Sequence, residues 1–407
     1  MAIEKIKVSL NFGTSKQEVG TLVVQHQLVY FRFAPSFLES NLEISPFKFK
    51  KTAEIITCSK EPFEGIPGVF NDSIPDGWGR LLLDRKLINQ GINSREIGVL
   101  DRLSLIGNNG MGALVYEPIS ETGVHFYTTL NLDDLSSESQ ELLANGNASF
   151  LDDLYHLGGN SVGARPKIMV NYNELNQTFN TTNEEKSTPW IIKFSALIDF
   201  IDISKIEFAY YKMALACGIK MNESKLFISE KGRSFFGSKR FDRIDNKRLH
   251  LHSSCGLLHD NFRYSTLDYG HIMDAANRLE NDLTACEKVF RLAVFNCFSL
   301  NMDDHSKNTA FLMDENGKWQ LAPAFDLTFS LSPGGYQSLS VAGEYQHINS
   351  ASLLKLANYF GIKDAMSIIE EVKEVISQWA FFATSLDINK KEFKLIEKAL
   401  QKKLKEG

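Results

Sequence analysis

The sequence has few cysteines and no long apolar run. Its 5 cysteines among 407 residues are odd in number, scattered, and never arranged as C-x-x-C. This pattern argues against a disulfide framework and against a zinc site. No segment approaches the roughly 18 apolar residues of a membrane helix, and the start, MAIEKIKVSLNFG, lacks the basic-then-apolar order of a signal peptide. We therefore expect a cytoplasmic protein with reduced cysteines and no membrane partner.

The sequence also lacks an excess of positive charge. It has 44 basic and 50 acidic residues, a net charge of −6, so no global positive field would attract nucleic acid. Direct DNA binding by this chain alone is not expected. Its 43% hydrophobic and 23% charged residues are typical of a globular protein, and its length predicts two or three packed units.

The first third of the chain predicts a small sheet followed by helices. The segments IKVSL, TLVVQ and LVYFRF are rich in β-forming residues and are separated by glycines and polar breaks, which favours antiparallel strands. LLLDRKLINQ predicts a helix, and the glycine cluster of DRLSLIGNNGMGALVYEP joins a helix end to a strand. Residues 131–150 are polar and acidic enough to mark a boundary.

The middle and later segments predict strands around a loop, then a core helix. A glycine-rich loop precedes the strands KIMVNY and PWIIKF, and the helical stretch SKIEFAYYKMALACGI ends at Gly218. A later helix begins with T-A-C-E, which predicts a capping box between Thr284 and Glu287. This apolar helix delivers residues 301–308 at its far end.

The polar stretch after that helix has the spacing of a phosphoryl-transfer site. Asp303 and Asn308 are five residues apart, as are the base and the metal-binding asparagine of a kinase catalytic loop. The pair Asn316-Gly317 favours a tight hairpin turn that would return Asp326 beside Asn308. A carboxylate and an amide oxygen are ligands that suit Mg²⁺. Asp303 is therefore the predicted base and Asp326 the principal metal ligand.

Several of these residues have simpler interpretations. Asp and Asn also suit helix ends and turns, and for Asp304 alone that role is the better interpretation. His305 could bond the base, reach a phosphate, or be structural. Asp303, Asp304 and His305 could also ligate the metal of a hydrolase, but such a site would need more close ligands.

The loop HLGGNSVGARPK, residues 156–167, can cradle phosphates. Glycines let backbone N–H groups approach phosphate oxygens, and Lys167 adds charge, although a structural turn is the alternative and no Walker motif is present. Lys193 lies in the apolar strand WIIKF and needs a partner. That partner is a triphosphate or Glu207, as in the lysine-glutamate pair of kinases. The alternatives are that Lys193 reaches solvent at a strand edge and that Glu207 is an exposed helix residue.

Ordered motifs over nearly the whole length resemble the HipA family of bacterial toxin-antitoxin serine/threonine kinases. They are FNDSIPDGWGRLLLDR, LIGNNGMGAL, GGNSVGARPK, WIIKF, SKRFDR, NMDDHSKN and LAPAFDL. The resemblance implies an α+β, two-lobed protein-kinase-like fold. It places a mostly β N-terminal subdomain at residues 1–130, a kinase N-lobe with the glycine-rich loop at 150–245, and a mostly helical C-lobe with the catalytic loop at 246–407.

The resemblance also implies ATP and Mg²⁺ as cofactors and assigns roles by residue. Asp303 is the catalytic base, and Asn308 and Asp326 bind the metal. The ATP-binding residues it implies are Val162, Gly163, Ala164, Arg165, Pro166, Lys167, Lys193, Lys239, Arg240, Phe241, His305, Lys307, Asn308, Phe325 and Asp326. Some members have an acidic residue where Lys239 stands in the adenine-contacting hinge.

Family members can phosphorylate a serine of the glycine-rich loop, which displaces the loop and switches the kinase off. Ser161 lies six residues before Lys167, whereas the common spacing is seven and would place Asn160 at this position. Ser161 is the candidate acceptor, and its assignment stays open.

The family halts growth by phosphorylating a translation component, typically an aminoacyl-tRNA synthetase. A small helix-turn-helix antitoxin, HipB-like, neutralises the kinase and represses the operon, so DNA would be contacted only through that partner. The alternative is a catalytically weak scaffold that mainly binds the antitoxin as a co-repressor. The presence of Asp303, Asn308 and Asp326 favours the kinase.

Overall fold

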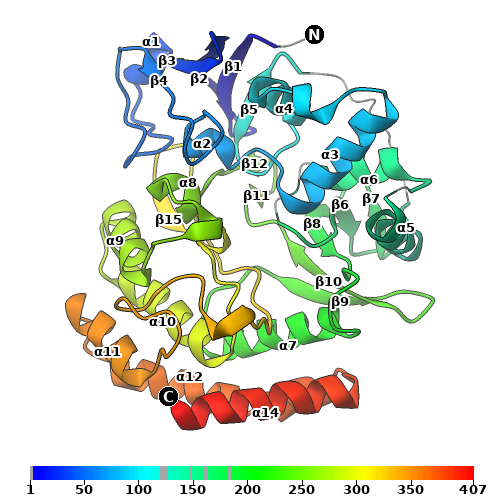
Figure 1. Cartoon of the computed structure of the whole chain (residues 1–407), viewed down its shortest axis with the longest axis vertical. Helices are drawn as coiled ribbons and strands as arrows, with labels where there is room; N and C mark the ends of the chain where they lie inside the picture. The colour runs from blue at the N-terminus through cyan, green and yellow to red at the C-terminus, as the bar shows by residue number, and fades with distance from the viewer. Residues whose placement is uncertain are drawn as a thin grey trace.

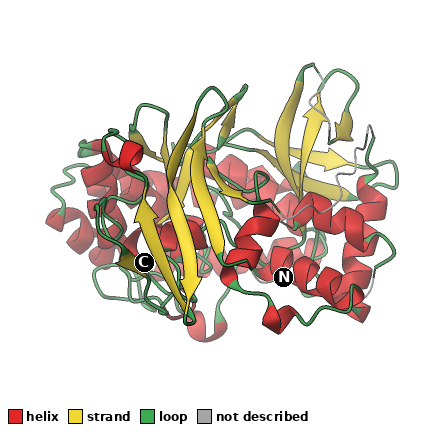
Figure 2. Ribbon diagram, turned by 90° about the horizontal axis from the view of Figure 1, so that it is seen from above, coloured by secondary structure: helices red, strands yellow, loops and turns green. Residues whose placement is uncertain are grey.

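The computed structural model describes residues 3–119, 127, 129–146, 148–159, 161, 163–181 and 185–407. Figure 1 shows an N-terminal sheet at the top, a second sheet beside and below it, and a helical region that ends with α14 (Lys390–Glu406) at the bottom. Figure 2 shows the strands gathered in separate sheets with helices packed around them. The architecture is α+β, as the sequence predicted.

The N-terminal sheet has the order β4-β3-β2-β1-β5, and its strands pair antiparallel. Its strands are β1 (Lys5–Asn11), β2 (Lys16–Gln25), β3 (Leu28–Phe33), β4 (Ile56–Thr57) and β5 (Leu114–Glu117). The three strands predicted from the sequence are confirmed. Phe31 is fully buried and its ring packs against Phe33 and Phe70 at centroid distances of 4.8 and 5.1 Å. This aromatic packing fixes the buried face of the sheet.

Four helices lie between β3 and β5 in the chain, within the connections of this sheet. They are α1 (Pro35–Leu38), α2 (Gly68–Asn71), α3 (Gly77–Asn89) and α4 (Val99–Ile106), with a 3₁₀ turn at Ser94–Glu96. The predicted helix at LLLDRKLINQ lies within α3 apart from its last residue. The predicted passage from a helix through glycines to a strand is also confirmed, because α4 ends at Ile106 and β5 begins at Leu114.

The second sheet has the order β7-β6-β8-β10-β9. Its strands are β6 (Lys167–Asn173), β7 (Thr178–Asn180), β8 (Ser187–Lys193), β9 (Ser224–Ile228) and β10 (Ser234–Lys239). Helix α7 (Ile203–Ala216) follows β8 and contacts β9 and β10. The core of this sheet includes Trp78 and Leu82 of α3, so α3 packs on the second sheet although it precedes that sheet in the chain.

The predicted boundary at residues 131–150 contains a helix, α5 (Leu132–Asn145). The Asn131 side chain caps it by accepting from the N–H groups of Asp133 and Asp134 at 2.9 and 3.2 Å. The leucines of this polar segment share one face and are buried in the core of the second sheet, together with α6 (Leu151–Gly158). The acidic composition concealed this buried stripe.

The C-terminal region is mostly helical around a three-stranded sheet, β13-β14-β15. Its strands are β13 (His250–Ser253), β14 (Ala310–Met313) and β15 (Trp319–Leu321), preceded by the pair β11 (Arg243–Ile244) and β12 (Lys247–Arg248). Its helices are α8 (Ser254–Leu258), α9 (Tyr269–Glu280), α10 (Thr284–Phe298), α11 (Ser350–Tyr359), α12 (Ala365–Ser377), α13 (Trp379–Thr384) and α14, with 3₁₀ turns at Phe262–Tyr264, Ser306–Asn308 and Pro333–Gly335. The predicted hairpin is confirmed as β14 and β15, with Gly317 at φ 83° in its turn.

The predicted capping box at the start of α10 is wrong. Leu283 occupies the N-cap position, and no side chain caps the helix there. Thr284 is the first helical residue, and its backbone N–H and hydroxyl both donate to the carboxylate of Asp282 at 2.9 and 2.6 Å. The local turn around Asp282 therefore satisfies the groups that the motif would have used.

The larger hydrophobic core joins the N-terminal sheet to the C-terminal helices. Phe31, Phe70, Phe290 and Ile369 belong to this one buried cluster, and each is fully buried. Most of α10 is enclosed within it. None of the helices in the described part of the chain is long and apolar enough to cross a membrane.

Candidate active site

The second sheet places two lysines side by side. Lys167 begins β6 and Lys193 ends β8, and the two residues are directly opposite each other in the antiparallel register. Directly opposite residues project from the same face of a sheet. Gly163, at φ 106°, lies against this pair, since a Cβ there would collide with Nζ of Lys167. The glycine-rich loop therefore lies at the lysine-bearing end of the sheet, as the sequence predicted.

Lys193 has two acidic partners. Its Nζ contacts Glu207 of α7 and Asp326, which follows the β14–β15 hairpin. The Lys193 side chain is 13% exposed and that of Glu207 is 5% exposed. The pairing with Glu207 was one of the two partners that the sequence left open, and solvent exposure at a strand edge is not observed. We call Lys167, Lys193, Glu207 and Asp326 the lysine cluster.

The charges of the lysine cluster hold one another in place. Burial alone would lower the pKa of Lys193, but Asp326 and Glu207 raise it to about 12. Burial likewise opposes the ionisation of Asp326, yet Lys193 and Lys167 hold the pKa of this carboxyl well below its usual range. The pKa of Lys167 is lowered by burial and by the charge of Lys193. The cluster therefore presents ammonium groups and a carboxylate at one point.

Asp326 also has an unusual backbone. Its φ of 55° lies in the left-handed region that non-glycine residues seldom adopt. Such conformations are concentrated at functional sites, where surrounding contacts impose them. The neighbouring backbone is fixed by Ala324, whose N–H donates to the carbonyl oxygen of Lys220 at 2.8 Å.

The loop after α10 orients Asp303 toward solvent and Asp304 toward the core. The Asp303 side chain is 57% exposed, and His305 Nε2 lies 3.8 Å from its Oδ1. Asn308 Nδ2 donates to the backbone oxygen of Asp303 at 2.7 Å, which braces the loop across its turn. Partial burial and the negative charge of Asp326 raise the pKa of Asp303, while His305 opposes that shift. Asp303 and Asp326 are therefore close enough to influence each other.

Asp304 is structural, as the simpler interpretation held. It is buried and accepts hydrogen bonds from the Tyr269 hydroxyl at 2.6 Å and from the Ser338 N–H at 2.8 Å. Burial raises its pKa to about 7, although these hydrogen bonds oppose the shift. In the described part of the chain no three His, Cys, Asp or Glu side chains are grouped as metal ligands, so the hydrolase interpretation gains no support.

Lys307 points to a residue that the sequence did not single out. Its Nζ lies 2.5 Å from Oδ2 of Asp76, which directly precedes α3. Asp76 Oδ1 accepts from the N–H of Gly163 in the glycine-rich loop at 2.6 Å. In the sequence Asp76 stands only in the turn-like P-D-G of a family motif. That position does not predict contacts with two loops that are distant in the chain.

The predicted hinge is occupied by contacts within the protein. The backbone N–H groups of Lys239 and Arg240 donate to the carbonyl oxygens of Glu223 and Pro189 at 2.8 and 2.9 Å. These donors are therefore engaged, and an adenine contact through either of them would require their release. Phe241 makes a side-chain contact instead. The centroid of its ring lies 5.4 Å from that of Phe325, and both rings pack against a small apolar cluster.

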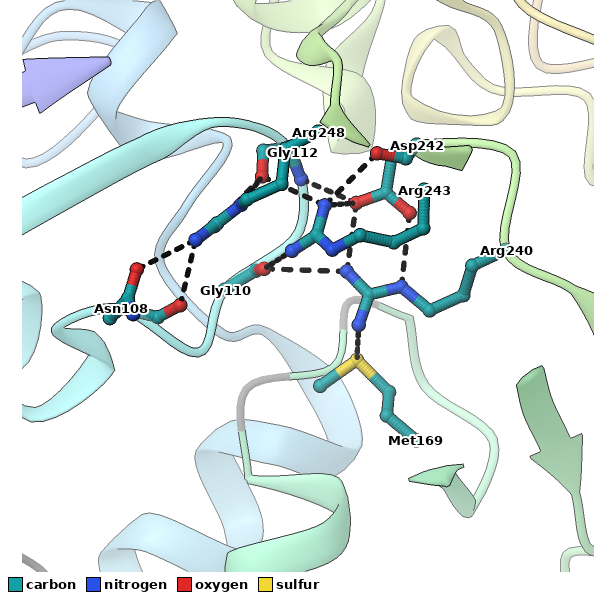
Figure 3. Close-up of polar contacts among 8 residues, drawn as sticks. All are labelled: Asn108, Gly110, Gly112, Met169, Arg240, Asp242, Arg243 and Arg248. Carbon is teal, nitrogen blue, oxygen red and sulfur yellow. Dashed lines mark hydrogen bonds and ion pairs between the residues drawn. The ribbon is translucent and has the colours of Figure 1, made fainter. Parts of the chain in front are cut away.

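Two arginines pair with one buried carboxylate next to the hinge, and a third arginine bonds to the turn beside them (Figure 3). We call Arg240, Asp242, Arg243 and Arg248 the arginine cluster. Asp242 is fully buried and accepts from Nε of Arg240 at 3.0 Å and from Nη1 of Arg243 at 2.5 Å. The guanidinium groups also donate to carbonyl oxygens of the turn at residues 108–112. The Arg240 side chain is therefore committed to packing the N-terminal region on the second sheet.

The other predicted residues of the glycine-rich loop make contacts of their own or lie outside the described part of the chain. Arg165 pairs with Asp199 at 3.0 Å, which anchors the glycine-rich loop to the segment before α7. Ser161 is buried, and its hydroxyl donates to the oxygen of Gly158 at 2.6 Å. Val162 and the alternative regulatory position, Asn160, lie outside the described residues.

Asn308 and Asp326 supply oxygen ligands of the kind that Mg²⁺ prefers. The amide nitrogen of Asn308 donates to Asp303, which leaves its oxygen as an acceptor, and Asp326 meets Lys193 through one of its two carboxylate oxygens. Both ligand atoms would be oxygens, so the residues fit a hard divalent cation. The sequence-based assignment of these two metal ligands remains a prediction.

Comparisons with known proteins concern the family and the fold of the chain. The HipA N-terminal domain family matches residues 10–117. A chain of the Shewanella oneidensis MR-1 toxin antitoxin system HipA, HipB and its operator DNA complex has a TM-score of 0.70 and 16% identity, over 98% of this chain and 96% of that one. The Helicobacter pylori proinflammatory kinase CtkA aligns at a TM-score of 0.33 and 15% identity, over 53% of this chain and 91% of its own. A search of curated protein sequences found no match.

The similarity to the Shewanella chain confirms the predicted two-lobed HipA-like fold over almost the whole length. The HipA-like C-terminal domain family matches residues 160–379, which is more than half of the chain and includes both the lysine cluster and Asp303. On this match the chain belongs to the HipA family.

Proposed function

We propose that the chain is an ATP- and Mg²⁺-dependent protein serine/threonine kinase that acts as the toxin of a toxin-antitoxin system. The observation that carries the proposal is Lys193, which contacts Glu207 and Asp326 at once beside the glycine-rich loop. A kinase needs this lysine-glutamate pair, a metal-binding aspartate and a catalytic aspartate at one place. Asp303 supplies the last of these.

In the proposed reaction, Asp303 orients the acceptor hydroxyl and accepts its proton. Its side chain is accessible, and His305 and Asn308 fix the loop that carries it. Lys193 and Lys167 neutralise charge on the phosphates that the glycine-rich loop would cradle. Mg²⁺ bound by Asn308 and Asp326 would neutralise further charge on the same phosphates. The reaction needs little covalent chemistry from the protein beyond this proton transfer.

The partners follow from the family. The similar Shewanella chain comes from a complex with HipB and operator DNA, which supports a helix-turn-helix antitoxin as partner and DNA contact through it. The net charge of −6 agrees with that division of labour. We propose a translation component, such as an aminoacyl-tRNA synthetase, as the protein substrate in the cytoplasm.

Ser161 is the proposed site of autophosphorylation. Its hydroxyl is buried and bonded to Gly158, so phosphorylation requires the loop to leave its position. A phosphate would then prevent the loop from returning, because a doubly charged group cannot occupy this buried position without a cation.

The test is the intact mass of the purified protein before and after incubation with ATP and Mg²⁺, beside Asp303→Asn. We expect one or more added phosphates in the wild type and a rate lower by about 10²–10⁴-fold in Asp303→Asn, because the general base is lost. Peptide mapping then identifies the acceptor. Equal rates in the two proteins would remove Asp303 from the mechanism.

The same experiment separates the kinase from the scaffold alternative. A wild type that starts one phosphate too heavy would already be switched off, and phosphatase treatment should restore its activity. If the starting mass is unmodified and calorimetry detects no nucleotide binding, the protein acts as an antitoxin-binding scaffold. Growth arrest on expression that is equal in wild type and Asp303→Asn would lead to the same conclusion.

A further inference from the structure

The carboxylate of Asp76 joins two loops that are about 140 residues apart in the chain. One oxygen accepts from the N–H of Gly163 at 2.6 Å, and the other lies 2.5 Å from Nζ of Lys307. Asp76 occupies the N-cap position of α3 but makes no side-chain bond to its own helix. An aspartate at this position usually caps the helix. Here the carboxylate bonds to the two loops instead of to its own helix.

The residues after Asp76 pack closely on the glycine-rich loop. The N–H of Trp78 donates to the oxygen of Gly163 at 3.0 Å, so Gly163 is held through both of its backbone polar groups. A Cβ on Gly77 would lie 2.6 Å from Cα of Ala164, and one on Gly79 would lie 2.7 Å from the oxygen of Ser161. The P-D-G-W-G motif therefore provides the close approach that lets Asp76 reach the loop.

The contact between Asp76 and Lys307 is largely removed from water. Their side chains are 18% and 8% exposed, and the Lys307 ammonium also lies 4.6 Å from the centre of the Phe262 ring. Burial opposes the charge on Asp76, but Lys307 and the Gly163 N–H hold its pKa below the usual range. Charge-assisted hydrogen bonds in such surroundings are among the stronger ones in proteins.

We infer that Asp76 is a positioning residue of the kinase site, by which the N-terminal region holds the glycine-rich loop closed over the catalytic loop. The inference rests on the proposed function, since the loop that carries Gly163 is proposed to cradle the phosphates and the loop that carries Lys307 also carries the proposed base. Loss of the tether frees both loops at once. The expected consequence is weaker binding of the phosphates, whereas the base Asp303 and its proton transfer are affected only indirectly.

Hydrogen exchange of the purified protein tests the tether without any nucleotide. In Asp76→Ala we expect the backbone amides of residues 163–165 to exchange about 10-fold faster, because a charge-assisted bond is lost. The amides of β8 and β10 should be unchanged and report on the fold. Asp84→Ala is the matched control, because this aspartate lies on the same helix, α3, and bonds to none of the described residues of either loop. Equal exchange of the loop in wild type and Asp76→Ala overturns the inference.

Ligand binding tests the positioning role. By calorimetry with Mg²⁺, we expect Asp76→Ala to weaken a non-hydrolysable ATP analogue about 10-fold and to leave adenosine affinity within about twofold. An equal loss for both ligands would indicate general damage and overturn the inference. Asp76→Asn keeps an oxygen for Gly163 and loses the charge that faces Lys307, so its affinity for the analogue should lie between those of the wild type and Asp76→Ala.

If Asp76→Ala does not fold, Asp76→Asn decides, and loop exchange or analogue affinity equal to wild type then overturns the inference. The failure of the proposed function is distinct. In that case the wild type binds neither the analogue nor adenosine, while hydrogen exchange still shows whether Asp76 holds the loop.

Discussion

The arginine cluster and the lysine cluster are both buried groups of charges, and they are resolved in opposite ways. In the arginine cluster one carboxylate, Asp242, pairs with the guanidinium groups of Arg240 and Arg243, and backbone oxygens of the turn at residues 108–112 accept from these two arginines and from Arg248 (Figure 3). In the lysine cluster the positive charge of Lys193 is met by two side-chain carboxylates, Glu207 and Asp326, beside the glycine-rich loop. The first cluster is complete as it stands, whereas we expect the second to receive a partner rich in negative charge.

The difference shows how a structural charge cluster can be distinguished from a binding one. Burial lowers the pKa of Arg243 to about 9, which shows how far its charge is removed from water. Its donors are used nonetheless, so ligand binding there would break existing bonds. In the lysine cluster the unusual backbone of Asp326 and the exposed carboxylate of Asp303 lie beside the charges. Burial and charge alone therefore do not identify a binding site. What identifies it is whether the hydrogen-bond donors of the charged groups are already used within the protein.

The largest effect on this comparison is expected from Asp242→Ala. It leaves the guanidinium groups of Arg240 and Arg243 without their anion, which should lower the free energy of unfolding by about 3–5 kcal/mol. Urea denaturation measures the loss. Asp326→Ala is the counterpart, because Lys193 keeps Glu207 and stability should change by about 1 kcal/mol.

Nucleotide affinity should rank these two variants in the reverse order. By calorimetry, Asp326→Ala should weaken Mg·ATP analogue binding at least about 10-fold, since the proposed metal ligand is lost. Folded Asp242→Ala should bind it as the wild type does. Unchanged affinity in Asp326→Ala would contradict its metal role and would break the distinction between the clusters.

A smaller effect is expected from the pH dependence of stability at Asp304. Its carboxyl has a pKa of about 7 in the fold against an ordinary value of 3.8, so the folded state binds the proton more tightly. Its contribution to stability is therefore fully present below about pH 4 and is lost as pH rises to about 7. The free energy of unfolding should fall by nearly 1.4 kcal/mol per pH unit in this range, which is about the slope expected for the release of one proton. Asp304→Asn should flatten this fall in urea denaturation measured from pH 4 to 8. A slope equal to wild type would show that another group titrates there.

The smallest effect is expected from Lys239→Ala. The Lys239 side chain is 36% exposed and its Nζ lies 3.8 Å from Oε2 of Glu223, so its loss should change stability by less than about 0.5 kcal/mol. Analogue affinity should also stay within about twofold, because the hinge position depends on its backbone. A larger loss of affinity would show that the Lys239 side chain contacts the nucleotide and would extend the binding site toward the arginine cluster.

Local patterns predicted the parts of this protein that depend on neighbouring residues in the chain. The strands at the start, the turn at Gly317 and the spacing of Asp303 and Asn308 were readable because turn preferences and side-chain alternation act over a few residues. The capping box at Thr284 failed for a related reason, since Asp282 two residues earlier offered a competing partner. Short-range rules are reliable only where no neighbour competes.

Contacts between distant segments could not be read in this way. The sequence left Lys193 with two possible partners, and the structure adds a third, Asp326, from 133 residues away. The commitment of Arg240 to Asp242 and to the turn at residues 108–112 was hidden in a family motif. Asp76 looked like a turn residue beside a helix. Each of these depends on which surfaces meet when the two hydrophobic cores form.

The sequence by itself determined the family, the order of the strands and hairpin, and the residue types needed for phosphoryl transfer. Only the tertiary structure decided which of those charges are neutralised inside the protein and which converge at one place. The physical reason is that a charge removed from water must find a partner, and the partner is set by packing between segments far apart in the chain. Asp242 and Asp326 are both aspartates beside arginine or lysine, and their surroundings alone separate them.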